Sequence, residues 1–227
     1  MDKSCCLGLV GGLGVGATVY YYEKLAKAHE RQGRTLDIVI AHAETSRVFA
    51  YVQAGDRRGL AEYLNGYIRR LRAAGAEIAA IPAVTPHFCV RELMATSPLQ
   101  VINIFDALVP ELVLRNVRRV AVFGTRFVIE SALFGELGSV EVIRPAPSEI
   151  DFIHNTYVEL ARSGKGSDQQ HREFTTLAHT LLRRHALDAV ILAGSDLALL
   201  FHDDNIDFPC IDAAALHIQA ILRRLLV

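Results

Sequence analysis

The alternation of short β-rich runs with longer stretches of helical period is the feature that most constrains the fold of this chain. The β-rich runs cover Leu7–Gly11, Asp37–His42, Ile78–Ile81, Val101–Ile104, Val120–Phe123, Val140–Ile143, Ala189–Leu192 and Phe208–Ile211. Apolar residues recur at spacings of three and four, as in helices, over Ala17–Gln32, Arg57–Ala74, Asp106–Asn116, Glu149–Arg162, His171–His185 and Ala213–Leu226. This rhythm predicts an α/β fold with parallel sheets, covering helices and right-handed crossovers.

A weak internal echo suggests that the chain has two similar halves. Val10-Gly11-Gly12 after the first predicted strand resembles Val122-Phe123-Gly124-Thr125 after the fifth, and Pro82–His87 is echoed by Ala193–Leu197. We therefore expect two Rossmann-like lobes related by a pseudo-twofold axis, with a site in the cleft between them at the carboxyl ends of the strands. The expected lobes are residues 1–100 with 213–227, and residues 101–212.

Composition and charge exclude several classes of function. The 227 residues are 51% hydrophobic and carry 24 Lys and Arg against 25 Asp and Glu, a formal net charge of -1. This balance argues against a nucleic-acid partner and against an anionic membrane surface. Because no apolar run approaches the roughly 20 residues that cross a bilayer, and a strand replaces any signal peptide near the N-terminus, we expect a cytoplasmic protein.

Neither the cysteines nor the acidic residues predict a metal or disulfide site. The four cysteines include no C-x-x-C pair, and Cys89 and Cys210 are expected to be buried small hydrophobic residues. His202-Asp203-Asp204 lacks the i, i+4 pairing of zinc-binding helices, which favours a solvated loop. We therefore expect no metal.

The glycine-rich first turn has three interpretations. Gly12 to Ala17 can be written G-x-G-x-x-A, one form of the dinucleotide fingerprint, and Glu44 after the second predicted strand is a late candidate for the ribose. The backbone N–H groups of such a turn also bind a plain carboxylate. The third interpretation is a tight turn with no ligand. We favour the carboxylate.

Seven short motifs, taken in order, resemble those of the aspartate/glutamate racemase family, which includes hydantoin racemases and arylmalonate decarboxylases. They are Gly11-Gly12-Leu13-Gly14, Arg47 in Glu44-Thr45-Ser46-Arg47, Pro82-Ala83-Val84-Thr85-Pro86-His87, Gly124-Thr125-Arg126, the segment Ile153–Gly164, Gly194-Ser195-Asp196-Leu197, and Asp212 with His217. The resemblance spans nearly the whole chain. It implies chemistry without a cofactor, in which two thiols flank the substrate Cα and act on its opposite faces.

The resemblance places Ala83 and Ser195 at the two thiol positions. Ala83 cannot transfer a proton, and the hydroxyl of Ser195 is a poor substitute for a thiol. Asp196 and His87 remain as one-sided acids or bases. Their alternatives are an N-cap role for Asp196 and an orienting role for His87.

The resemblance implies a set of carboxylate-binding groups, and this chain matches that set more fully than it matches the family's acid/base residues. Arg47 is expected to form a bidentate clamp, and further hydroxyl and backbone donors are expected from Gly12, Gly14, Thr85, Gly124 and Thr125. Their alternative is a role in ordinary turns and caps. Arg162 falls near the position of a basic ligand in the family, or faces solvent.

We therefore expect a racemase-like isomerase for a small amino or carboxylic acid such as aspartate or glutamate, with altered proton-transfer residues. The alternatives are a catalytically inactive carboxylate-binding homologue and one-sided chemistry such as decarboxylation. The expected partner is a small-molecule acid, and the expected assembly is a homodimer.

Overall fold

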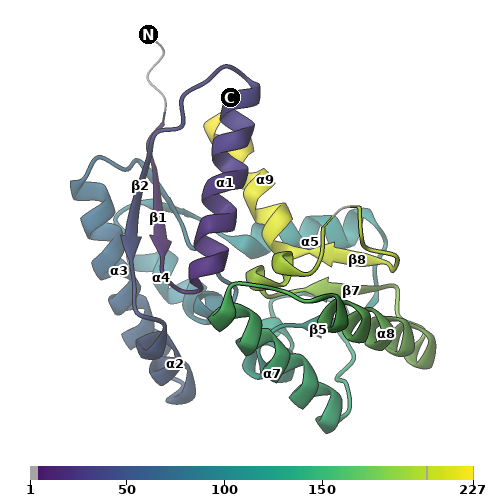
Figure 1. Cartoon of the computed structure of the whole chain (residues 1–227). Coiled ribbons are helices and arrows are strands. Elements are labelled where there is room, and N and C mark those ends of the chain that lie inside the picture. The colour runs from purple at the N-terminus through teal and green to yellow at the C-terminus, as the bar shows by residue number, and fades with distance from the viewer. Residues whose placement is uncertain (1–4, 203, 227) are drawn as a thin grey trace. The chain divides into compact units, whose positions relative to one another are not determined.

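The computed structural model describes residues 5–202 and 204–226, and the chain divides into two compact units. Unit 1 is Met1–Ile104 with His217–Val227, and unit 2 is Phe105–Leu216. Each unit contains one four-stranded parallel sheet with helices packed on it (Figure 1). The predicted α/β class with two parallel sheets is confirmed.

The sheet of unit 1 has the strand order β2-β1-β3-β4. All five residues of its central strand β1 are buried, as expected for an inner strand of a parallel sheet. The strands are β1 (Leu7–Gly11), β2 (Ile38–His42), β3 (Ile78–Ala80) and β4 (Gln100–Ile102). The helical elements are α1 (Val15–Arg31), α2 (Thr45–Gln53), α3 (Arg57–Ala73), the 3-10 turn η1 (Thr85–Cys89), α4 (Val90–Thr96) and most of α9 (Ala213–Leu225).

The helix α3 shows how the sequence pattern builds this core. Its buried residues include Leu60, Leu64, Ile68 and Leu71, which recur at helical spacing and are fully enclosed. A Cβ at Gly8 of β1 would lie 3.0 Å from the Cβ atom of Leu71, so glycine lets the helix approach the strand closely. Asp56 begins the helix by accepting a hydrogen bond from the Gly59 N–H at 2.8 Å.

The sheet of unit 2 repeats this strand order as β6-β5-β7-β8. Its strands are β5 (Arg119–Phe123), β6 (Glu141–Val142), β7 (Ala189–Leu192) and β8 (Cys210–Asp212). Its helical elements are α5 (Ile104–Leu114), α6 (Arg126–Glu130), η2 (Leu133–Gly135), α7 (Pro147–Ser163), α8 (Asp168–His185) and η3 (Ser195–Leu199).

Because both sheets have the same strand order, the similar sequence segments of the two halves occupy equivalent positions in the two units. Gly12 follows the first strand of unit 1, and Gly124 follows the first strand of unit 2. The loops that contain Ala83 and Ser195 follow the third strands, β3 and β7. In both units the first and third strands are neighbours at the middle of the sheet, where the strand order reverses and α/β proteins bind ligands.

The structure also differs from the predictions in places. The short helices α2, α4 and α6 were not predicted, and β8 begins two residues later than expected. Cys89 is buried as predicted, but Cys210 is only half-buried, because it lies on the outermost strand of its sheet.

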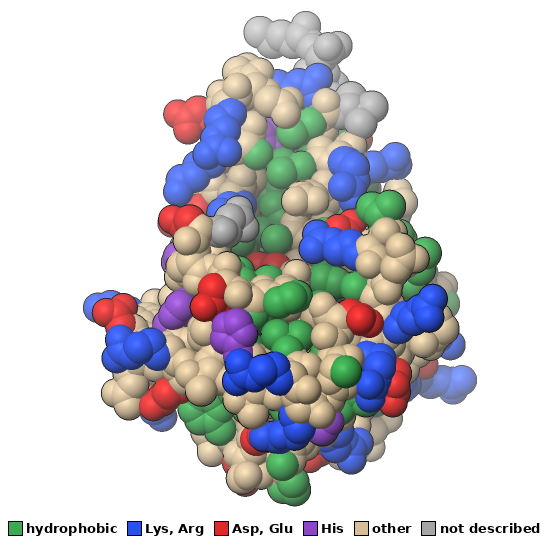
Figure 2. All heavy atoms as spheres, turned by 90° about the vertical axis from the view of Figure 1, so that its right-hand side faces the viewer, with side chains coloured by type: hydrophobic (Ala, Val, Ile, Leu, Met, Phe, Trp, Pro, Cys, Tyr) green, Lys and Arg blue, Asp and Glu red, His purple; other side chains and the backbone are tan. Residues whose placement is uncertain are grey.

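The surface agrees with the balanced composition. Figure 2 shows basic and acidic side chains interspersed with neutral ones over one face of the molecule. Among the described residues, no helix is both long and apolar enough to span a membrane.

Candidate functional site

The glycine-rich turn after β1 leads into α1 without a side-chain cap. Gly12 has a φ of 82°, and a Cβ there would lie 2.5 Å from the Ala43 carbonyl oxygen, so only glycine fits. Its N–H donates to Thr18 Oγ1 at 3.0 Å and its carbonyl accepts from Thr45 Oγ1 at 2.7 Å. Gly14 is the N-cap residue of α1 and has no side chain to cap the helix, whose first turn has no acidic side chain. The start of α1 is thus the part of the turn that can receive an anion, because helix N-termini attract negative charge.

The dinucleotide interpretation of this turn gains no support from Glu44. Its carboxylate accepts a hydrogen bond from Ser46 Oγ, and the residue is the N-cap of α2.

Arg47 lies on the exposed side of α2. Its guanidinium stacks over the Tyr63 ring with 4.7 Å from Cζ to the ring centroid. It lines a surface cavity of about 360 Å³ together with residues of α3, among them Tyr67, Arg69 and Arg70. The predicted clamp is therefore held by an aromatic ring at the junction of α2 and α3.

In the loop after β3, Ala83 is buried and Thr85 is partly exposed. Ala83 is buried, with 6% of its surface exposed, and its carbonyl accepts a hydrogen bond from His87 Nδ1 at 2.8 Å. Thr85 begins η1 and is half-buried. Its hydroxyl has no hydrogen-bond partner among the residues that the structure describes, so this hydroxyl is available to a ligand.

His87 is enclosed in the core of unit 1 rather than presented to a ligand. Only 1% of its surface is exposed, and its two ring nitrogens contact the Ala83 carbonyl oxygen at 2.8 Å and the Ile104 N–H at 3.5 Å. Burial lowers the pKa of His87 to about 4, so the ring is neutral at pH 7. These contacts favour its orienting role: it fixes the Ala83 loop.

A second buried histidine is His217 on α9. The sequence motifs include it together with Asp212 but predict no role for it. Its Nε2 lies 2.8 Å from the Ile102 carbonyl oxygen, and its Nδ1 lies 3.1 Å from the Tyr21 hydroxyl on α1. Burial and the neighbouring His87 lower the pKa of His217 to about 3. Its ring meets that of His87 edge to face at 5.9 Å between centroids. Asp212, the other residue of the motif, caps α9 by accepting from the Ala214 N–H at 2.8 Å.

In unit 2, the turn after β5 is packed against the loop after β7. A Cβ at Gly124 would lie 3.0 Å from the Ala193 carbonyl oxygen, so glycine keeps the two loops in contact. Thr125 is buried, and its hydroxyl caps α6 by accepting from the Val128 N–H at 3.3 Å. Capping therefore already occupies the Thr125 hydroxyl oxygen.

The loop after β7 carries the two residues of unit 2 that are candidates for proton transfer. Ser195 and Asp196 begin η3 and have 4% and 2% of their surfaces exposed. The Tyr157 hydroxyl on α7 donates to Asp196 Oδ2 at 3.1 Å. Burial, and then the charge of Asp196, raises the pKa of Tyr157 well above its usual range, which keeps the phenol protonated. The Tyr157 ring lies over Gly194, where a Cβ would come within 2.3 Å of its Cε2.

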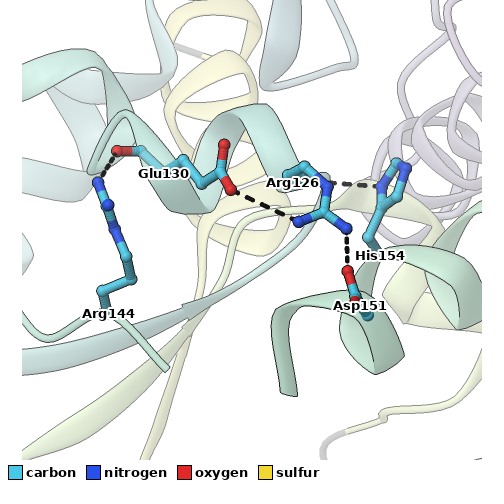
Figure 3. A network of polar contacts seen from close by, with 5 residues as sticks. All are labelled: Arg126, Glu130, Arg144, Asp151 and His154. Carbon is cyan, nitrogen blue, oxygen red and sulfur yellow. Dashed lines mark hydrogen bonds and ion pairs between the residues drawn. The ribbon is translucent and has the colours of Figure 1, made fainter. Parts of the chain in front are cut away.

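Arg162 and Arg126 differ in their surroundings. Arg162 is exposed in the last turn of α7 and makes no ion pair with any residue in the described part of the chain. Arg126 belongs to a polar network on α6 and α7 that Figure 3 shows. Its guanidinium pairs with Asp151 and Glu130, and its backbone N–H donates to His154 Nδ1 at 3.2 Å. The network fixes the start of α6 to α7.

Within residues 5–202 and 204–226, no group of three or more His, Cys, Asp or Glu side chains could hold a metal ion. Asp203, part of the segment considered for a metal, lies outside the described residues.

The predicted site residues thus fall into two groups with different chemistry. Unit 1 offers carboxylate donors at the start of α1 and at Thr85, with an apolar side chain at Ala83. Unit 2 offers Ser195 and a buried carboxylate, Asp196, hydrogen-bonded to Tyr157. Tyr157 was not predicted as a site residue, although it lies in the helix motif Ile153–Gly164.

Comparison with known proteins gives both a family and a fold. The Asp/Glu/hydantoin racemase family model matches residues 10–221. A search of curated protein sequences gives no match. The fold is similar to that of an aspartate racemase homologue from Pyrococcus horikoshii, with a TM-score of 0.80 at 21% identity over 98% of this chain and 99% of that chain.

Two further solved structures share the fold at lower identity. The aspartate racemase of Picrophilus torridus aligns with a TM-score of 0.74 at 17% identity over 97% of this chain and 94% of that chain. A glutamate racemase from Francisella tularensis, solved in complex with D-glutamate, aligns with a TM-score of 0.62 at 16% identity over 98% of this chain and 81% of that chain.

Proposed function

Because the chain belongs to the Asp/Glu/hydantoin racemase family, we propose that it binds a small amino or carboxylic acid such as aspartate or glutamate and transfers a proton at the carbon beside the carboxyl group. The reaction needs no cofactor. Proton transfer is one-sided, in contrast to the two-thiol scheme that the sequence resemblance implies. A single acid/base group removes and returns the proton.

The observation that carries this proposal is the unequal distribution of ionisable groups. In unit 2, Asp196 is buried and held by Tyr157 next to Ser195. In unit 1, Ala83 has no ionisable side chain, and the two ring nitrogens of His87 contact backbone groups of the Ala83 loop and of Ile104. Asp196 is therefore the side chain best suited to act as the acid/base.

Tyr157 acts on Asp196 as a positioning residue. Because its phenol stays protonated, it donates to Asp196 Oδ2 and holds the carboxylate in one orientation. We expect faster reaction for acids whose carbanion is stabilised by a second acyl or aryl group.

Carboxylate recognition is assigned to unit 1. The hydroxyl of Thr85 has no partner in the described structure, and the uncapped start of α1 at Gly14 offers backbone N–H groups. Both are neutral donors that suit a carboxylate, and Arg47 adds a positive charge on α2.

The test is exchange of the Cα proton for deuterium in D₂O, followed by proton NMR for both enantiomers of aspartate, glutamate and a set of α-substituted carboxylic acids. We expect exchange with at least one acid. Replacing Asp196 by Asn should slow that exchange by about 100-fold or more, the usual contribution of a positioned acid/base. The matched control is Asp207→Asn, which removes an exposed carboxylate of the same unit that pairs with His179.

Two outcomes would contradict the proposal. Exchange that Asp196→Asn leaves unchanged would remove Asp196 from the reaction. Absence of exchange with every acid would favour a second candidate function, a carboxylate-binding protein without turnover. That candidate is supported by the same donors of unit 1 and predicts thermal stabilisation by acids without any chemical change.

One-sided chemistry also includes decarboxylation, the third function considered from the sequence. It needs a single group that protonates the carbanion left by the departing carboxylate, and Asp196 in its protonated form can supply that proton. Release of carbon dioxide from malonate-like acids would identify this reaction.

A further inference from the structure

A groove between α3 and α4 of unit 1 has an unusual set of polar residues. It encloses a cavity of about 550 Å³, a size typical of small-molecule sites. On α3, the side chains of Arg58, Glu62, Asn65 and Arg69 line it at spacings of four, three and four residues, which places them on one face of the helix. None of the described residues predicted for the acid site lines this groove.

Asn65 lies at the floor of the groove, with 2% of its surface exposed. Its Nδ2 donates to Thr96 Oγ1 at 2.8 Å, and Thr96 Oγ1 donates to the Glu92 carbonyl oxygen at 3.0 Å. Because the only hydroxyl proton of Thr96 is used in the second bond, Thr96 can only accept from Asn65. This chain fixes the orientation of the Asn65 amide. Its Oδ1 is buried without a hydrogen-bond partner in the described structure.

Glu92 on α4 adds a second acceptor to the same groove. Its Oε2 is also buried and has no hydrogen-bond partner among the described residues. Buried acceptors without a donor are rare and unfavourable in folded proteins. Two of them among the residues that line one groove indicate that a donor-bearing group belongs there.

The rim of the groove carries charges that have no partners. Arg58, Arg69 and Glu62 are exposed, and none of them forms an ion pair with another residue in the described ranges. Two arginines and two glutamates give the groove no formal net charge. A neutral ligand that carries charges of both signs matches this arrangement.

We propose that the groove between α3 and α4 binds a small zwitterion. Its ammonium group donates to Asn65 Oδ1 and to Glu92 Oε2, and its carboxylate is bound by Arg58 and Arg69. Ala61 and Ala95, which also line the groove, leave the space for the connecting carbons. The inference does not depend on the proposed acid chemistry.

The test uses 4-aminobutyrate as the probe, because this zwitterion has no α-amino group and is not an α-amino acid substrate. The full chain, labelled with nitrogen-15, is titrated and the side-chain amide signal of Asn65 is followed by NMR, after assignment by its loss in Asn65→Ala. We expect a saturable shift of this signal. Butylamine and butyrate, each with one of the two charges, should bind at least 10-fold more weakly.

Variants at the groove separate the two charges. Glu92→Gln keeps the shape of the side chain and should weaken binding of 4-aminobutyrate at least 5-fold, and Arg69→Gln should do the same. Glu173→Gln on α8 is the matched control and should leave binding unchanged. The proposal is overturned if no probe shifts the Asn65 signal, as expected when water satisfies both oxygens, or if butyrate or butylamine binds as tightly as 4-aminobutyrate.

Discussion

At the residue scale, the role of a side chain here depends on whether its hydrogen-bonding groups are already occupied. The sequence motif placed Thr85 and His87 in one loop as candidate ligands or catalysts. In the structure, both His87 ring nitrogens are engaged, while the Thr85 hydroxyl has no partner among the described residues. The two residues therefore have opposite expected roles: His87 fixes the loop, and Thr85 binds.

The Thr85 hydroxyl gives a direct prediction for binding. Thr85→Val keeps the shape and removes the donor, which should weaken binding of a carboxylic acid about 10-fold, the effect of one hydrogen bond of roughly 1.4 kcal/mol. Thermal stabilisation by the acid measures the change. Thr180→Val is the control, because that hydroxyl donates to the Thr176 carbonyl on α8. Equal loss in both variants would contradict a specific role for Thr85.

Gly194 is a second position where adding one atom, a Cβ, should change stability and exchange. A Cβ there would lie 2.3 Å from Cε2 of Tyr157, so Gly194→Ala should displace the ring and break its bond to Asp196. We expect a loss of about 1–3 kcal/mol in the free energy of unfolding, typical of overpacking, and slower Cα exchange.

The matched control for this prediction is Gly66→Ala in α3. The atom nearest to an added Cβ there is 4.0 Å away, and alanine favours a helix, so stability should stay the same or rise. Denaturant unfolding of both variants measures the difference. A Gly194→Ala variant as stable as Gly66→Ala would contradict the close packing of Tyr157.

At the element scale, β4, η1 and α9 are held together by two buried neutral histidines. His87 on η1 and His217 on α9 contact backbone atoms of Ile104 and Ile102, next to and within β4. Their pKa values are lowered to about 4 and about 3 by burial. The loop that contains Ala83 is therefore anchored by groups that must stay uncharged.

This anchoring predicts acid sensitivity. Above pH 6.5 both histidines are neutral in the folded and unfolded states, and their stabilising contacts are fully present. Below pH 6.5 the unfolded chain binds protons that the folded chain does not, so the free energy of unfolding falls as pH is lowered toward 4. Each histidine contributes a slope of up to about 1.4 kcal/mol per pH unit.

Denaturant unfolding between pH 7 and pH 4 measures this slope. His217→Gln should reduce it by removing one titrating group, whereas substitution of the exposed His202 by Gln should leave it unchanged. A free energy of unfolding that stays constant from pH 7 to pH 5 would contradict the buried neutral state of both histidines.

The elements themselves were largely readable from the sequence. Leu7–Gly11 and Ala189–Leu192 form strands with the predicted bounds because each is a continuous apolar run between turn residues. The helix α2 was missed, since only Val48 and Val52 are buried over its nine residues. The side-chain contacts were harder to predict from the sequence than the elements. The hydrogen bond between Tyr21 and His217 joins residues 196 positions apart, and no local sequence pattern indicates it.

At the scale of the whole molecule, two units with the same strand order carry different chemistry after equivalent strands. The loop after β3 contains Ala83, and the loop after β7 contains Ser195 and Asp196. The two-thiol scheme that the sequence resemblance implies needs an acid/base group at both positions, whereas the proposed one-sided reaction needs only the group after β7. The requirement for both groups is testable, because both positions can be changed to thiols.

The double variant Ala83→Cys with Ser195→Cys should gain racemisation of an amino acid, which neither single variant should show. A thiol is a much stronger candidate base near pH 7 than a hydroxyl, and the two-thiol scheme requires both positions. Chiral chromatography of the product measures the gain. Racemisation by Ala83→Cys alone, at the rate of the double variant, would show that the second thiol position lies elsewhere.

The most direct test of one-sided proton transfer compares, in one incubation of the natural chain in D₂O, the rate of deuterium incorporation at Cα with the rate at which configuration is lost. With Asp196 as the only acid/base, deuterium returns to the face from which the proton left. The expected result is incorporation of deuterium with the original handedness retained. Inversion at a rate equal to that of incorporation would contradict the account.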